Sequence, residues 1–562
     1  MTVFQRRVRT RGLRRWRAGA ALAALLLVTG TAGTAGTAGA AGARGEPRAV
    51  GPGTDGPRTT APRTAEPRTA EPRATAPRTD WSRIDAFVRG RLDATGTPGA
   101  ALAVIEGGRV VHERGFGEDG RGRPVTPGTP FLWGSVSKPV TGVAVMQLAE
   151  AGRIDIDEPV RTYLPWFRLA DGAASARITP RHLLTNTSGI PTAASGEVGD
   201  RYDNAPSALT RAVRALADVS PQARPGESYA YSSAGYAVLG ALVEEVTGQP
   251  FGAYLHAKVL GPLGMEHAVV TEGDFARERV APGHRSVFGR QVAFDAPYDT
   301  SGVPFGHVGG SLRDLTRFVR AELGGGALEG RRILSPRTTA DTQYGHVRSS
   351  TGRYGLGWSV GTLKGTGERT VWKDGALPGF HAMVVMLPES DRAVVVLQNA
   401  YHQLRAREFG DAAFGTAQLL SGARPTTTPR DPLVTALPWT LGALSLVLLT
   451  ALAAPAVRRR GRAHRAAVRA RSRTRTTLTT LAATTACLAL AGTLWWFPTT
   501  MDGTLRMALL WAPDTGWAAV TALALSLLLA AERVALGVRD VRAGRRRGSD
   551  GEAGPREPSP VA

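Results

Sequence analysis

The sequence is poor in cysteine, with a single residue, Cys487, among its 562 positions. One cysteine excludes an intrachain disulfide and a metal site built from paired cysteines. The ten histidines also form no close pair at the spacing of metal ligands. We therefore expect no metal and no cofactor, and any chemistry has to come from ordinary side chains.

Lysine is almost as scarce. Of the 69 lysine and arginine residues, only four are lysine: Lys138, Lys258, Lys364 and Lys373. Arginine stays protonated at any pH that a protein meets, whereas a desolvated lysine can lose its proton and act as a base. A sequence that uses arginine for nearly every solvated cation is expected to keep lysine where arginine cannot substitute.

Acidic residues are outnumbered, which gives the chain a net charge of +22 and a pI near 11.1. Such a balance would suit nucleic acid, but the excess lies in the flanks. Residues 81–425 carry 37 Lys or Arg against 34 Asp or Glu, residues 1–80 carry 14 against 5, and residues 426–562 carry 18 against 8. Because the central part is nearly neutral, we expect no nucleic-acid partner.

The first 80 residues lack the pattern of a folded domain. Residues 1–43 pass from an arginine-rich start through a short apolar run to Ala-x-Ala steps, the order typical of a secretory signal peptide. Residues 44–80 repeat Pro, Thr, Ala and Arg and have no large apolar residue after Val50. A segment that cannot bury apolar surface is expected to be a disordered linker.

The C-terminal part contains three apolar stretches of membrane length within residues 433–538, at about Leu433–Val457, Thr476–Phe497 and Trp517–Val538. The loop 458–475 holds nine arginines and no acidic residue, and the tail 539–562 is also basic. The positive-inside rule places both in the cytoplasm and everything before the first stretch outside. The signal peptide independently predicts the same topology, a multi-pass protein of the cell membrane.

Residues 81–425 read as one α+β domain. A helix is expected from Trp81, a hairpin of two strands joined by Gly107-Gly108 follows, and further strands return after residue 354. The middle, about 140–345, has mostly helical and loop patterns. We expect an antiparallel sheet flanked by helices with an inserted helical lobe, a domain that folds and reacts without the membrane segments.

The candidate chemistry begins at Ser135-Val136-Ser137-Lys138. At the start of a helix, a lysine three residues after a serine lies above it on the same face. The following residues have helical apolar spacing up to Gly152. A serine hydroxyl becomes a nucleophile when a nearby base takes its proton, so Ser135 and Lys138 are a candidate nucleophile and base.

Several further stretches, taken with this one, resemble the β-lactamase-related serine hydrolases, which include class C β-lactamases, penicillin-binding D-Ala-D-Ala carboxypeptidases and esterases. The resemblance covers about residues 81–420. It is carried by segments in the family's order, namely Phe131–Pro139, Gly152–Val160, Ile178–Gly189, Pro225–Glu227, Tyr231–Tyr236, Gly309–Ser311, Lys373–Gly375 and Pro378–Phe380. It implies a β-lactamase/transpeptidase-like fold and acyl transfer.

The resemblance implies a role for each matching residue. Ser135 is the acylated nucleophile, Lys138 its proton partner, and Tyr231 a proton carrier to the leaving group. Held among cations, Tyr231 is expected to have a lowered pKa. The backbone N–H groups of Ser135 and Ala376 would form the oxyanion hole.

The substrate-binding positions implied by the resemblance are Ser233, Lys373, Asp374 and Gly375, and here the sequence departs from the family. Ser233 replaces an asparagine of the Tyr-x-Asn motif, and Asp374 replaces a Thr or Ser after the lysine. A carboxylate at 374 would repel a carboxylate substrate or occupy Lys373. Asn186 replaces the family's histidine before Thr-Ser-Gly, a change that the sequence does not explain.

A rival nucleophile, Ser359, lies in Gly357-Trp358-Ser359-Val360-Gly361. A nucleophile elbow requires a helix directly after the serine, and the residues that follow do not begin one. We interpret Ser359 as a strand residue.

These patterns predict a membrane-anchored extracytoplasmic serine hydrolase that acts through an acyl-enzyme on amide, peptide or ester bonds. Its expected partners are the membrane and a small-molecule or peptide substrate, such as a cell-wall peptide, a D-amino-acid peptide, an ester or a β-lactam. The alternative is a catalytically weak, penicillin-binding-like sensor or cell-wall peptide-binding protein.

Overall fold

The computed structural model describes residues 79–462, 473–497 and 504–551. The predicted signal peptide and nearly all of the predicted linker lie outside these ranges, as do residues 463–472 of the arginine-rich loop and residues 552–562 of the tail.

An eight-stranded antiparallel sheet forms the centre of the domain, in the order β2-β1-β14-β13-β12-β11-β10-β9. This confirms the predicted α+β class. The sheet joins two strands from the start of the domain to six from its end. Its strands are β1 (Gly99–Glu106), β2 (Arg109–Gly117), β9 (Val347–Ser349), β10 (Gly352–Tyr354), β11 (Ser359–Thr362), β12 (Arg369–Leu377), β13 (Phe380–Leu387) and β14 (Arg392–Gln398).

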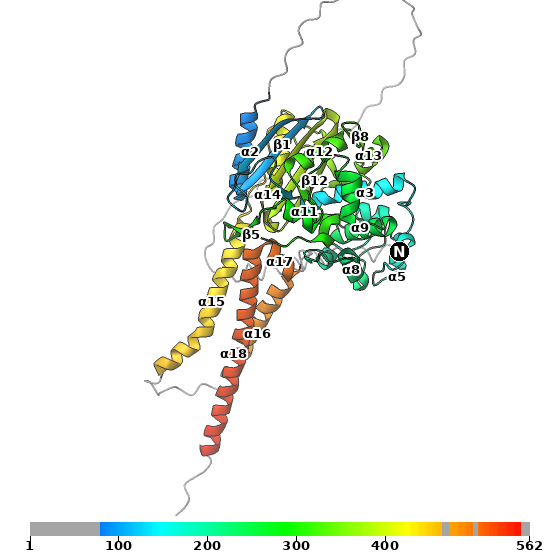
Figure 1. Cartoon of the computed structure of the whole chain (residues 1–562). Helices are drawn as coiled ribbons and strands as arrows, with labels where there is room; N and C mark the ends of the chain where they lie inside the picture. Colours follow the sequence, from blue (N-terminus) through cyan, green and yellow to red (C-terminus); the bar gives the residue numbers. More distant parts are fainter. Residues whose placement is uncertain (1–78, 463–472, 498–503, 552–562) are drawn as a thin grey trace, which may run out of the picture. The chain divides into compact units, whose positions relative to one another are not determined.

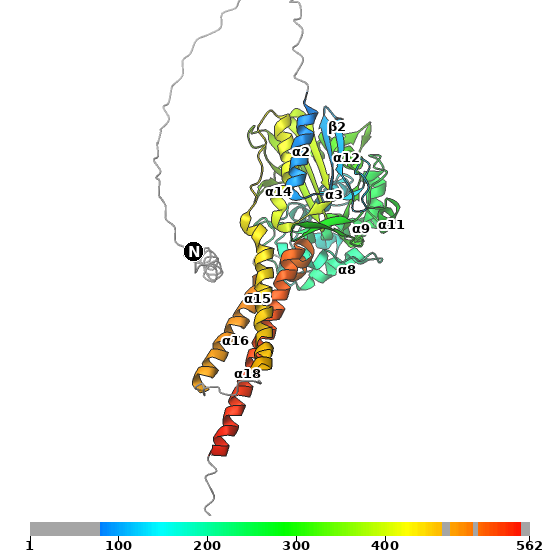
Figure 2. The ribbon, with the colours of Figure 1, turned by 90° about the vertical axis from the view of Figure 1, so that its left-hand side faces the viewer.

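Both faces of the sheet are covered, so its central strands are apolar on both sides. Val394 and Val396 of β14 pack in one buried cluster, and Val395 between them packs in the other, because successive side chains of a strand point to opposite faces. Helices α2 (Trp81–Thr95) and α14 (Ala406–Leu420) cover the first face, and α12 (Leu312–Leu323) lies against the second (Figures 1 and 2).

The opening helix has clear local causes. The Asp80 side chain accepts hydrogen bonds from the backbone N–H groups of Ser82 and Arg83, and Gly96 ends the helix in the left-handed conformation. The predicted Gly107-Gly108 hairpin is also present, between β1 and β2. After residue 354, where the sequence predicts that strands return, β10 ends and β11 begins, and these two strands pair with each other.

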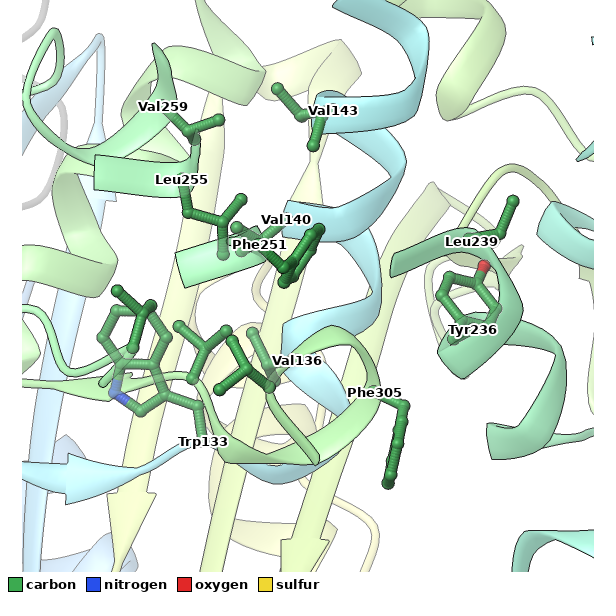
Figure 3. Close-up of a cluster of buried hydrophobic side chains, with 14 of the residues drawn as sticks. Trp133, Val136, Val140, Val143, Tyr236, Leu239, Phe251, Leu255, Val259 and Phe305 are labelled. Carbon is green, nitrogen blue, oxygen red and sulfur yellow. The ribbon is translucent and has the colours of Figure 1, made fainter. Parts of the chain in front are cut away.

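The inserted lobe is built around α3 (Ser137–Glu150) and α9 (Ser233–Thr247). Helix α3 is buried over most of its surface. Its residues Val140 and Val143 lie near Phe251 and Leu255, which belong to α10 (Phe251–Leu255) (Figure 3). The lobe also contains short strands that the sequence did not predict, including the pair β4 (Gly283–Val287) and β5 (Arg290–Phe294).

Among the described residues of the C-terminal part, three helices are long and apolar enough to cross a membrane, as expected. They are α15 (Pro432–Arg462), α16 (Arg473–Trp496) and α18 (Pro513–Gly551), with candidate spans at Pro432–Ala454, Thr477–Trp496 and Pro513–Arg539. A seven-residue helix, α17 (Leu505–Trp511), lies between the second and the third. The third span begins four residues earlier than its predicted start.

Candidate active site

Ser135 lies in η1 (Gly134–Val136), a single 3-10 turn that leads directly into α3. The turn is seated on strand β12. Gly134 has a φ of +54°, and a Cβ built on it would lie 2.2 Å from the Ala376 nitrogen. A Cβ on Gly375 would lie 1.9 Å from the Trp133 carbonyl oxygen. Since no real side chain tolerates such distances, both glycines are needed to bring Ser135 against β12.

Lys138, one turn later, points back at Ser135. Its Nζ is 3.0 Å from Ser135 Oγ, 3.2 Å from Ser233 Oγ and 2.9 Å from the Phe305 carbonyl oxygen. The side chain is fully buried, and no carboxylate lies within ion-pair distance of its Nζ in the described part of the chain. Burial, followed by the positive charge of Lys373, holds the pKa of Lys138 well below its usual value. A buried amine in this state can accept a proton from a neighbouring hydroxyl.

Lys373 approaches the same site from β12. Its Nζ donates to the hydroxyl oxygens of Tyr231 at 3.3 Å and Tyr354 at 3.2 Å. Burial lowers the pKa of Lys373 to about 8, although the nearby Asp374 carboxylate acts in the opposite direction. Tyr231 stands between the two lysines, whose Nζ atoms are 4.9 Å (Lys138) and 4.6 Å (Lys373) from its ring centre.

The expectation that neighbouring cations lower the pKa of Tyr231 is wrong. Its pKa is raised well above the usual value, first by burial of the hydroxyl and then by the negative charge of Asp374. The physical reason is that burial opposes every charged form. The same burial lowers the pKa of both lysines beside the ring. The site therefore favours a protonated phenol at Tyr231, which is suited to donating a proton.

The backbone N–H groups predicted for the oxyanion hole lie where β12 has an open edge. Strand β11 pairs with β12 only from Arg369 to Trp372, so Lys373 to Leu377 have no partner on that side. Ala376 is therefore not part of an edge strand but of an inner strand that is locally uncovered. The turn carrying Ser135 packs against the face of the sheet at Gly375 and Ala376, and Lys373, Asp374, Ala376 and Leu377 line the cavity.

The three residues that depart from the family pattern, Ser233, Asp374 and Asn186, differ in their contacts. Ser233 begins α9; its Oγ accepts from Lys138, and its N–H donates to Ser195 Oγ at 2.9 Å. Asp374 is exposed and makes no ion pair with Lys373 within 4.0 Å in the described structure. Asn186 adopts a φ of +57°, and its Oδ1 accepts from the Ser232 N–H at 3.0 Å.

These residues surround a cavity of about 390 Å³. The predicted site residues that line it are Ser135, Tyr231, Ser233, Lys373, Asp374 and Ala376. Lys138 and Gly375 are buried and do not line it. The structure therefore brings all eight predicted site residues together, although they come from positions as far apart as 135 and 376.

The structure also bears on site residues other than the eight predicted ones. Ser359 lines the cavity, but it begins β11 and no helix follows it, as predicted, so it does not stand at a nucleophile elbow. His381 is buried and stacks on Tyr401, whereas His307 lines the cavity. Tyr354 was missed; its hydroxyl contacts Lys373, but only the fold brings it near the site. Also missed were Arg506, Met507 and Trp511 of α17, which line the cavity.

Comparisons with known proteins agree with this arrangement. The family model described as Beta-lactamase matches residues 84–415. Penicillin-binding protein 4 of Amycolatopsis lactamdurans is 36% identical over 260 residues, which are 44% of this chain and 67% of that protein. Protein flp of Staphylococcus aureus (strain MW2) is 25% identical over 319 residues, 56% of this chain; the chain spans only 62% of the length of flp.

Among solved structures, the octameric penicillin-binding protein homologue from Pyrococcus abyssi is similar, with a TM-score of 0.51 and 26% sequence identity. The match covers 62% of this chain and 78% of that one. The matched region of the family model is more than half of the chain and contains the central sheet, the helical lobe and the Ser135–Lys138 cluster. The chain belongs to the Beta-lactamase family.

Proposed function

We propose that this protein is a membrane-anchored serine hydrolase that acts outside the cell through an acyl-enzyme at Ser135. Its reaction class is the hydrolysis of amide, peptide or ester bonds. Membership of the Beta-lactamase family supports peptide- and β-lactam-type substrates in general.

One observation carries the proposal: Lys138 Nζ lies 3.0 Å from Ser135 Oγ, and burial lowers the pKa of that amine. A neutral Lys138 takes the hydroxyl proton as Ser135 attacks the substrate carbonyl carbon. The N–H groups of Ser135 and Ala376 would stabilise the negative charge that forms on the carbonyl oxygen.

Proton delivery to the leaving group is the role we assign to Tyr231. Its raised pKa keeps the phenol protonated, and its hydroxyl lies beside Lys373. As the tetrahedral intermediate collapses, the C–N or C–O bond breaks and the leaving group takes the phenol proton. Lys138 resupplies that proton to Tyr231. A water molecule then attacks the acyl carbon while neutral Lys138 takes one of its protons. Lys138 passes that proton to Ser135 Oγ as the bond between Oγ and the acyl carbon breaks.

Anchoring and orientation belong to the same proposal. The three apolar helices are suited to the membrane by length and composition. The arginine-rich loop 458–475 and the basic tail favour a cytoplasmic position for the inner helix ends. The catalytic domain would then lie outside, where the predicted signal peptide would deliver it.

The test is labelling of the full chain in detergent with a fluorophosphonate, followed by mass spectrometry of the modified peptide. We expect one adduct, on Ser135, that Ser135→Ala abolishes and Ser359→Ala retains. A second sample receives penicillin. A stable penicilloyl adduct, with no turnover of any ester or peptide, would favour the sensor hypothesis. No adduct at Ser135 with either reagent would overturn the proposal.

A further inference from the structure

Helix α17 connects the second and third apolar helices, and it contributes to the active-site cavity. The hydroxyl of Thr504 caps the helix by accepting from the Met507 N–H. Arg506, Met507 and Trp511 then line the same cavity as Ser135 and Lys373. A connection between membrane helices is thus part of the wall around the candidate nucleophile.

Several contacts attach α17 to the helical lobe, including hydrogen bonds to Asp200 and one from Arg285 to the Leu510 carbonyl oxygen. The Arg506 guanidinium donates to the Asp200 carbonyl oxygen, and Trp511 Nε1 donates to Asp200 Oδ2 at 3.1 Å. A Cβ built on Gly196 would lie 3.8 Å from Met507 Sδ. Asp200 itself lines the cavity. The two hydrogen bonds to Asp200 meet at one residue, which fixes α17 along the cavity rim.

The first turn of α18 is attached as well. Asp514 Oδ1 lies 3.2 Å from His402 Nε2, and its Oδ2 accepts from the Phe288 N–H at 3.3 Å. The Phe288 ring packs against Trp439 of α15 at 5.0 Å between ring centres. Since the candidate span begins at Pro513, these contacts hold the cavity beside the outer ends of the apolar helices.

Exposed tryptophans gather at that same end of the helices. Trp439 lies in the second turn of α15, Trp495 near the end of α16, and Trp517 near the start of α18. Tryptophan is enriched where membrane helices meet the water interface. The aromatic residues therefore mark an interface at the level of α17, whose residues line the cavity.

We propose that α17 is the wall of the cavity that determines specificity, and that its substrates are amphiphiles held at the membrane surface. The ester or amide carbonyl of such a substrate would reach Ser135 past Met507 and Trp511, while its apolar part stays in the outer leaflet. The inference rests on the proposed function, because it needs Ser135 to be the nucleophile and the domain to be outside.

The position of α17 is tested by disulfide cross-linking in membranes. With Cys487 replaced by serine, we introduce Gly196→Cys together with Met507→Cys. Mild oxidation is expected to join this pair, because Gly196 and Met507 face each other across the rim. The matched control pairs Gly196→Cys with Leu478→Cys, an exposed position near the opposite end of α16. Equal cross-linking of both pairs, or of neither, would overturn the inference.

The substrate class is tested by kinetics of the full chain in phosphatidylglycerol vesicles. We compare a long-chain p-nitrophenyl ester dissolved in the bilayer with soluble p-nitrophenyl acetate. Met507→Trp, which narrows the rim, should change the ratio of the two kcat/KM values by about tenfold. Trp495→Ala, an interfacial aromatic outside the cavity lining, should leave the ratio unchanged.

The two proposals fail differently. If the parent chain gives no adduct at Ser135, the proposed function is wrong. The other failure begins with a parent chain that is labelled at Ser135 and hydrolyses the soluble ester. If that chain never prefers the long-chain ester, and Met507→Trp behaves like Trp495→Ala, only the inference about α17 is wrong.

Discussion

At the scale of single residues, the two buried lysines differ in the hydroxyl groups that they contact. Lys138 contacts Ser135 and Ser233, whereas Lys373 contacts Tyr231 and Tyr354. Burial lowers the pKa of both, more strongly for Lys138. These different contacts support different roles for the two lysines. Lys138 acts as the base, and protonated Lys373 donates a hydrogen bond to the Tyr231 hydroxyl.

The first prediction concerns the base. Lys138→Arg keeps the positive charge but cannot accept the proton of Ser135, so we expect the acylation rate to fall by about 10²–10⁴-fold. The rate is measured by stopped-flow with an activated ester. Lys258→Arg, at an exposed lysine, is the matched control and should react like the parent. Full activity of Lys138→Arg would mean that another group is the base.

The second prediction concerns pH. The rate of acylation should rise with pH as Lys138 loses its proton, and fall as Lys373 loses its charge near its pKa of about 8. A bell-shaped profile of kcat/KM is therefore expected. In Lys373→Arg the charge persists, so the falling limb should move above about pH 10. Lys364→Arg, at an exposed lysine, should keep the parent profile; an unmoved limb in Lys373→Arg would contradict the assignment.

The third prediction concerns Asp374, whose exposed carboxylate lines the cavity. It should repel penicillins and peptides that end in a carboxylate, so Asp374→Thr should raise their acylation rate by about tenfold. A neutral ester should react at nearly the same rate in both proteins. Asp374→Glu, which keeps the charge, is the control. The idea fails if the parent already hydrolyses penicillins faster than neutral esters.

The backbone conformation of Asn186 gives a reason for asparagine at this position. Its φ of +57° is a conformation that asparagine tolerates better than most residues, and its side chain accepts from the Ser232 N–H. Its carbonyl oxygen also accepts from the Ala230 N–H at 2.8 Å. Asn186 thus holds the backbone on both sides of Tyr231, a positioning role for the residue that replaces the family's histidine.

At the scale of elements, the site depends on the contact between η1 and β12. Two backbone segments approach so closely that neither Gly134 nor Gly375 leaves room for a side chain. As a consequence, the N–H groups of Ser135 and Ala376 lie in one small region. In the described structure β11 does not pair with β12 beyond Trp372, so this part of β12 is uncovered on one edge.

The fourth prediction tests the contact between η1 and β12. In Gly375→Ala the new methyl group would overlap the Trp133 carbonyl, so we expect a destabilisation of about 1–3 kcal/mol and a large loss of acylation. Gly90→Ala is the matched control, because its Cβ meets nothing within 4 Å in α2. Thermal unfolding and fluorophosphonate labelling measure the two effects. Normal stability and labelling of Gly375→Ala would show that the turn is not held as described.

At the scale of the whole molecule, the fifth prediction concerns topology. Protease added to intact cells should cut near residues 421–431, between α14 and α15, and release the catalytic domain. A tag fused to the C-terminus should stay protected until the membrane is broken, because the basic loop and tail favour the cytoplasmic side. A cytoplasmic marker protein is the control for cell integrity. Cleavage of the tag in intact cells would reverse the orientation.

Local patterns in the sequence were sufficient for the fold class, for α2 and the first hairpin, and for the three apolar helices. Local spacing also singled out Ser135 and Lys138, and the resemblance to a family implied the other six residues that the structure gathers at the site. These features depend on short-range periodicity, on capping, on runs of apolar residues, and on motifs whose order in the chain is retained across a family. Ser135 and Lys138 are three residues apart, so a single helical turn is enough to bring them together.

Tertiary structure alone decided what depends on surroundings. The direction of the Tyr231 pKa shift could not be predicted from the neighbouring lysines, because burial of the hydroxyl is its largest cause and burial is a property of the whole fold. Tyr354 and Lys373 meet only because β10 and β12 lie in one sheet. The position of α17 depends on a hydrogen bond between Trp511 and Asp200. Neither segment has a periodic or local sequence pattern that predicts this contact.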